Sequence, residues 1–230
     1  MIELAHAGNA TMDQAEEVMG EVSAADRQSW RFGTCLHEAG HCVAAWYVSF
    51  PLSNVSVPVF LSESATQKGV TRFKRPRLGD KPPPDDADDW HRSLILKATE
   101  NQAIMLMAGC WAFVQILDTD FVDEFLKQVT REGGIGDGDK LLRLLADHAD
   151  ETKGRIMAGA YQCLTALFDN PRVWAATVAL AKEIEQREIL KRKTVAQLLK
   201  QSLGDPADLR DEIRRIVAAA ATSSEDRKPR

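Results

Sequence analysis

Five consecutive residues, His37-Glu38-Ala39-Gly40-His41, carry the side chains from which a hydrolytic metal site is built. If this segment is helical, residues four apart lie on one face, about 5–6 Å apart at Cβ, so both imidazoles can reach one ion. Glu38 stands at the rim of that face, where its carboxylate can address a metal-bound water without ligating the metal. With a third ligand from elsewhere, these residues predict metal-assisted hydrolysis, with zinc activating the water and Glu38 as general base.

The spacing H-E-x-x-H is typical of zinc peptidase helices. The competing interpretation is an ordinary buried helix whose two histidines are hydrogen-bonded in the core. Gly40 argues against that interpretation, because a glycine inside a helix costs about 1 kcal/mol relative to alanine and usually marks the close approach of another backbone.

The composition favours a single globular unit that binds neither nucleic acid nor membrane. A chain of 230 residues with 44% hydrophobic content can bury a full core. The formal net charge of −5, with scattered acidic residues, leaves no basic face for nucleic acid. The longest apolar stretch, residues 103–117, is shorter than the roughly 20 residues that a membrane span needs. Residues 1–9 lack a basic start and an apolar run, so we expect no signal peptide.

The four cysteines, Cys35, Cys42, Cys110 and Cys163, form no C-x-x-C pair and lack the spacing of a small secreted domain. We expect them to be reduced, mostly buried thiols of a cytoplasmic protein. On a helix, neither Cys35 nor Cys42 shares the face of the two histidines, so both are interpreted as packing residues.

The motif helix is expected to begin at Thr34 as N-cap, since residues 31–33 break the apolar pattern, and to end near residues 49–51. Residues 54–61 then alternate apolar and polar, which predicts a strand. Pro58 favours an edge strand or a bulge over a central strand, because proline cannot donate to the ladder. Residues 69–73 are its expected antiparallel partner. Such a sheet beside the motif helix can offer its edge to an extended peptide.

The remaining chain predicts mostly helices. Residues 74–89, rich in Arg, Pro, Gly and Asp, favour a solvated loop over an acidic cation site, and the adjacent His91 is weak evidence for a ligand. Residues 90–117 predict a long helix whose second half is apolar on all sides and hence central to the bundle. Shorter helical patterns follow, with breaks at the glycine-rich residues 132–139, at 169–171 and at 204–206. They cover residues 121–131, the stretch from the glycine-rich loop to 168, 173–189, 193–203 and 207–220.

The motif and its context resemble the peptidase domain of the FtsH family, membrane-anchored ATP-dependent zinc proteases. The shared features are H-E-A-G-H, a valine-rich strand, the G-V-T-x-F strand at 69–73, the small-residue stretch Gly109–Ala112 and a glycine-rich turn ending in aspartate. A looser match lies at residues 160–180. The resemblance implies a mainly α, zincin-type helical bundle with a small antiparallel β-sheet beside the motif helix. It covers roughly residues 33–203, so we expect an N-terminal extension (1–30), a peptidase domain (31–205) and a C-terminal helix with a polar tail (206–230).

The resemblance also implies that His37 and His41 hold Zn²⁺, that Glu38 is the catalytic base and that an aspartate is the third ligand. Aligning that aspartate with Asp137 places leucines 141, 144 and 145 at the apolar positions of the family pattern. Aligning it with Asp139 places Arg143 at one of them, so Asp137 is preferred and Asp139 remains the alternative.

We expect neither an ATPase module nor a membrane anchor, so the expected activity is that of an ATP-independent zinc metalloendopeptidase. Its substrate would be a protein or peptide: a flexible segment, an unfolded tail or a protein presented by a partner. A homo-oligomer and an ATPase acting in trans are both compatible with the sequence. The alternative function is a non-catalytic helical interaction module that keeps the fold and a structural zinc. Hydrolysis of a small amide is a third hypothesis.

Overall fold

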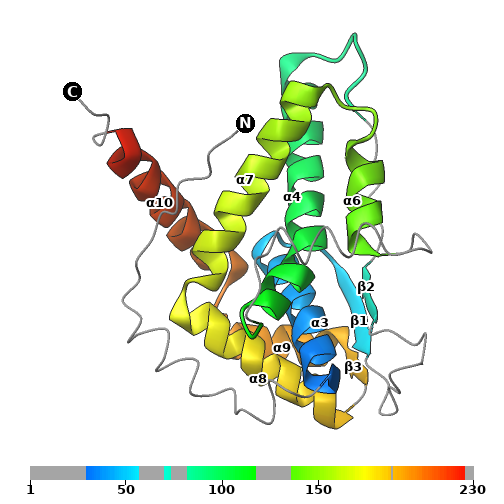
Figure 1. The fold of residues 1–230 in the computed structure, drawn as a ribbon, viewed down its shortest axis with the longest axis vertical. Coiled ribbons are helices and arrows are strands. Elements are labelled where there is room, and N and C mark those ends of the chain that lie inside the picture. The colour runs from blue at the N-terminus through cyan, green and yellow to red at the C-terminus, as the bar shows by residue number, and fades with distance from the viewer. Residues whose placement is uncertain (1–29, 57–69, 74–81, 118–135, 188, 226–230) are drawn as a thin grey trace.

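The computed structural model of the protein describes residues 30–56, 70–73, 82–117, 136–187 and 189–225. These residues form a mainly helical fold with a small antiparallel sheet beside one helix (Figure 1), as predicted. The helices are α3 (Trp30–Tyr47), α4 (Asp89–Val114), α6 (Asp137–Leu145), α7 (Asp150–Phe168), α8 (Pro171–Arg187), α9 (Arg192–Leu203) and α10 (Pro206–Glu225). The strands are β1 (Leu52–Ser56), β2 (Val70–Phe73) and β3 (Ile189–Lys191).

The motif helix α3 packs against α4, α8 and the sheet, so it is buried on most of its surface. The prediction that it begins at the N-cap Thr34 is wrong, because the helix begins at Trp30. Residues 31–33 are held in the helix by packing: Phe32 is fully buried, and a Cβ on Gly33 would lie 2.6 Å from Cε2 of Phe113 on α4. The local break in the apolar pattern is therefore overridden by a tertiary contact.

Helices α3 and α4 cross at closely approaching backbones. A Cβ on Gly40 would lie 2.5 Å from the carbonyl oxygen of Ala108 and 2.7 Å from Cβ of Ala112. The expectation that Gly40 marks the approach of another backbone is confirmed. This crossing places the second half of α4 beside the two motif histidines.

Helix α4 is the long central helix that the sequence predicts. Its N-cap Asp88 accepts a hydrogen bond from the backbone N–H of His91, and its second half is almost wholly buried. Helices α6 and α7 both pack on it, and Figure 1 shows the three side by side. On α6, the leucines at 141, 144 and 145 are buried and Leu142 is exposed.

The sheet has the strand order β2-β1-β3, with both pairs antiparallel. Strand β1 is therefore central, and the preference for an edge strand is wrong for residues 52–56, while Pro58 lies outside the described residues. The register of β1 and β2 shifts between Leu52 and Asn54. Strand β3 was also missed, since the helix before it was predicted to reach residue 189. Three residues are too few to show a period of two.

Helices α8, α9 and α10 follow the predicted pattern, with breaks near 169–171 and 204–206. The prediction of one helical stretch from the glycine-rich loop to residue 168 is wrong, because α6 ends at Leu145 and α7 begins at Asp150. All four cysteines are buried free thiols, as expected. Within the described residues we find no helix with the length and apolarity of a bilayer-crossing segment. Some predictions lie outside these residues: the N-terminal extension up to residue 29, the alternation beyond 56, the loop at 74–81, the helix at 121–131 and glycine-rich residues 132–135.

Candidate metal centre

Three predicted ligands converge at the junction of α3 and α6. The Nε2 atoms of His37 and His41 lie 3.1 Å apart, and Oδ2 of Asp137 lies 3.2 Å from the first and 2.9 Å from the second. Among the described residues, this is the one group of three or more His, Cys, Asp or Glu side chains whose ligand atoms could hold an ion together. We call it the His-His-Asp group.

The two histidines meet because they stand four positions apart on α3 and therefore share one helical face. Their ring centroids are 4.7 Å apart, and the ring planes are nearly perpendicular. The space at their Nε2 atoms depends on Gly109 of α4. A Cβ at Gly109 would lie 2.6 Å from Nε2 of His37 and closer still to Nε2 of His41. In the sequence, Gly109 stood out only as part of the small-residue stretch 109–112, and its role in leaving this space was missed.

Asp137 is the first residue of α6, and the buried leucines of that helix hold it against α4. Its Oδ2 faces the histidines, whereas Oδ1 accepts a hydrogen bond of 2.7 Å from Nζ of Lys140. Asp139 is not part of the His-His-Asp group. Two residues along a helix correspond to a rotation of about 200°, so Asp139 projects away when Asp137 projects inward. The structure thus places the preferred aspartate beside the histidines.

The tautomer of His41 follows from its partner on α4. Nδ1 of His41 lies 2.6 Å from the carbonyl oxygen of Met105, which can only accept, so Nδ1 carries a proton and donates it. The Nε2 atom of the neutral ring then has a lone pair, directed at the carboxylate of Asp137 and at the other imidazole. Acceptors that face one another require a proton or a metal cation between them.

The charges of the group favour a bound cation. Burial lowers the pKa of His41, but the charge and hydrogen bond of Asp137, the charge of Glu38 and the Met105 carbonyl outweigh it and raise that pKa above 6.5. Burial raises the pKa of Asp137, but the two histidines oppose it and hold that pKa well below 3.8. The carboxylate is therefore ionised at neutral pH, and a proton and a metal ion compete for the same position.

Glu38, the predicted base, is not part of the His-His-Asp group. Its side chain is buried, and Oε2 accepts a hydrogen bond of 2.5 Å from Oγ1 of Thr71 on β2. Strand β2 therefore covers this part of α3, and the role of Glu38 as a base that acts on a metal-bound water stays a prediction. Thr71 was not singled out from the sequence, although it stands in the G-V-T-x-F segment at 69–73.

The cysteines and His91 stay outside the group. Burial, with the nearby charge of Glu185, raises the pKa of Cys35 to about 12, and burial with the charge of Glu38 raises the pKa of Cys42 as well. Both remain neutral thiols and pack in the core, as predicted. His91 is exposed and pairs with Asp88 at the N-terminus of α4. It has a capping role there.

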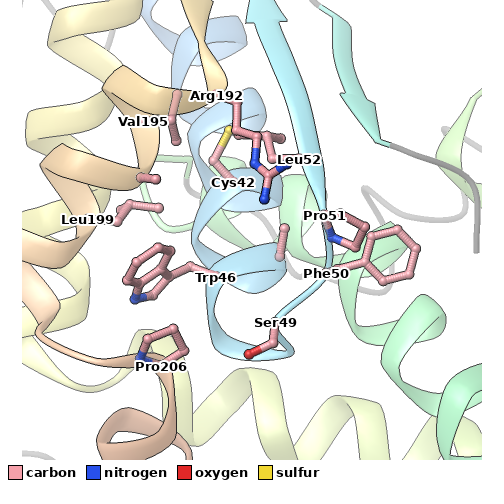
Figure 2. Close-up of a pocket in the computed structure, with 12 residues that line it drawn as sticks. Cys42, Trp46, Ser49, Phe50, Pro51, Leu52, Arg192, Val195, Leu199 and Pro206 are labelled. Atoms are coloured by element: carbon pink, nitrogen blue, oxygen red, sulfur yellow. The ribbon is translucent and has the colours of Figure 1, made fainter.

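A separate pocket of about 250 Å³ lies between the C-terminal half of α3, the start of β1 and α9 (Figure 2). It is lined mainly by apolar side chains, among them Trp46, Leu52 and Leu199, with Arg192 reaching into it. No residue of the His-His-Asp group lines this pocket, and neither does Glu38.

No family model matches this chain, and no curated protein matches it. The geometry and chemistry of the residues themselves therefore have to indicate the function.

Proposed function

We propose that the protein is a zinc-dependent metallopeptidase in which His37, His41 and Asp137 hold the metal and Glu38 is the general base. The observation that carries this proposal is the convergence of two imidazole Nε2 atoms and one carboxylate oxygen within 3.2 Å of one another. Two histidines and one carboxylate form a ligand set of catalytic zinc sites, in which a fourth position remains for water.

Second contacts support the same interpretation. Ligating histidines in zinc sites usually donate their other N–H to a carbonyl or carboxylate, as His41 does to Met105. Ligating carboxylates are themselves hydrogen-bonded, as Asp137 is by Lys140. A pair of histidines that were only packed in the core would need neither the Asp137 carboxylate nor the space that Gly109 leaves beside their Nε2 atoms.

We also infer that the fold is a zincin-type, FtsH-like peptidase arrangement. Three features support this inference: the motif lies on a helix beside a small sheet, a second long helix crosses it at glycines, and the aspartate stands at the start of a later helix. These features occur in the order that the sequence resemblance implies.

The chemistry divides between the metal and Glu38. Bound zinc would supply a Lewis acid that lowers the pKa of a water and polarises a peptide carbonyl. Glu38 adjoins His37 in the sequence and its charge acts on His41, so its carboxylate is close to the group without belonging to it. In this proposal the carboxylate takes a proton from the attacking water and delivers it to the leaving amine.

Strand β2 suggests the form of the substrate. Among the described strands it pairs only with β1, so its second edge has no partner in that set. Its residue Thr71 contacts Glu38, so strand β2 lies beside the proposed base. An extended peptide that paired with β2 would pass close to the site. Flexible protein segments are therefore the substrate class that we propose, cleaved without ATP.

The test compares purified wild type with Glu38→Gln, measuring zinc per chain by elemental analysis and cleavage of unfolded casein. The proposal expects one zinc in both proteins and cleavage by wild type only, with the rate of the variant lower by about 10²–10⁴-fold. A wild type without metal overturns it. For the third ligand, Asp137→Ala should lose zinc and Asp139→Ala should retain it. Equal retention would contradict the assignment of Asp137.

A second candidate function, a non-catalytic interaction module with a structural zinc, is favoured by one observation. Glu38 is only 5% exposed and is engaged by Thr71, so its carboxylate has little access to solvent. The same experiment separates the two, because zinc in wild type with no cleavage supports the module.

A further inference from the structure

We propose that Thr71 is a positioning residue: its hydroxyl holds the carboxylate of Glu38 at the His-His-Asp group, so β2 sets the orientation of a base that belongs to α3. This inference rests on the proposed function for its catalytic consequence, but the contact that it describes can be tested without any activity.

The hydroxyl of Thr71 lies near two acceptors of the same residue. Oγ1 of Thr71 is 2.5 Å from Oε2 of Glu38 and 3.3 Å from the backbone oxygen of Glu38. A hydroxyl has one proton to donate, and a charged carboxylate at the shorter distance is the stronger acceptor. Thr71 therefore donates to the carboxylate.

The direction of this side chain is set by strand pairing. Thr71 lies opposite Val55 of β1, which in turn lies opposite Leu190 of β3, so the three side chains share one face of the sheet. Val55 and Leu190 are fully buried, which identifies that face as the inner one, toward α3. The neighbours Val70 and Arg72 are exposed. A register shift by one residue would replace the hydroxyl with an isopropyl or guanidinium group.

The kinetic test compares Thr71→Val, which keeps the shape and removes the hydroxyl, with Thr71→Ser, which keeps the hydroxyl. We expect Thr71→Val to retain zinc and to lower kcat by about 10–100-fold, the usual cost of removing such a partner, with KM within about twofold. Thr71→Ser should stay within about threefold of the wild-type kcat, since the donor is kept. A Thr71→Val chain with wild-type kcat, or a Thr71→Ser chain as slow as Thr71→Val, overturns the inference.

The second test needs no catalysis. Thr71→Val is introduced into wild type and into Glu38→Gln, and the loss of Tm is measured for both pairs in the full-length chain. A hydrogen bond to a carboxylate is about twice as strong as one to an amide, so the loss should be about twice as large when Glu38 is present. Equal losses overturn the inference. Absence of zinc or of cleavage in wild type instead overturns the proposed function. The comparison of Tm losses still decides the role of Thr71 in that case.

Discussion

Gly109→Ala tests whether helix α4 provides the space in which a metal ion binds. The new Cβ would lie 2.6 Å from Nε2 of His37 and 2.8 Å from its Cδ2, and still closer to Nε2 of His41. Carbon atoms in contact are normally separated by about 3.5 Å, so the nearer ring atoms must move by roughly 0.9 Å. His41 cannot move freely, because it is buried and bonded to Met105. Relief of both clashes therefore requires that the His37 ring moves and that either the His41–Met105 hydrogen bond breaks or α3 and α4 move apart.

This displacement exceeds what a zinc site tolerates, because ligand distances are held to about ±0.2 Å. We expect the zinc affinity to fall by at least about 100-fold, which corresponds to roughly 2.8 kcal/mol. The fold should survive. Overpacking costs about 1–3 kcal/mol, and replacing a helical glycine by alanine returns up to about 1 kcal/mol. The net cost is about 0–2 kcal/mol, or a Tm loss of at most about 8 °C for a chain of this size.

The assay is calorimetric titration of the metal-free variant with zinc, together with thermal unfolding. Gly154→Ala is the matched control: it introduces the same change in helix α7, where an added Cβ would meet no atom within 4 Å. The control should bind zinc like wild type, with an unchanged or slightly higher Tm. A folded Gly109→Ala chain that binds zinc with wild-type affinity would refute the assignment of the site to the space beside Gly109.

Two further predictions follow from the crossing of α3 with α4 and from the charges of the site. Gly40→Ala should lower the free energy of unfolding in urea by about 1–3 kcal/mol, because the new Cβ would meet the backbone oxygen of Ala108, which cannot turn aside. A variant as stable as wild type would contradict the close crossing of α3 and α4. The pKa of His41 is raised above 6.5, and zinc must displace the proton that His41 binds below that pKa. Zinc affinity should therefore fall about tenfold for each pH unit below the raised pKa. Asp137 does not contribute to this loss, because it stays ionised down to below pH 3.8. Titrations between pH 5 and 8 that show no such loss would exclude His41 as a ligand.

Predictions from sequence were most accurate where a local period carried the information. The apolar second half of α4 predicted a buried helix. The preference for Asp137 over Asp139 came from the family resemblance, in which the leucines after Asp137 match the apolar positions. The predictions from sequence failed where tertiary packing outweighed a local sequence signal. The motif helix extends past Thr34 to Trp30, because Phe32 is buried and Gly33 packs on α4. Strand β1 is central because β3, too short to show a pattern, pairs with its second edge.

The sequence by itself determined which side chains are available and how they are spaced along one helix. Two histidines four residues apart share a face of any α-helix, whatever surrounds it. Only the tertiary structure decided that Asp137, 96 residues after His41, joins them, that Gly109 leaves the space, and that Thr71 contacts the carboxylate of Glu38. Such contacts depend on which faces of α3, α4, α6 and the sheet pack together. That packing is a property of the whole core, and no single segment encodes it.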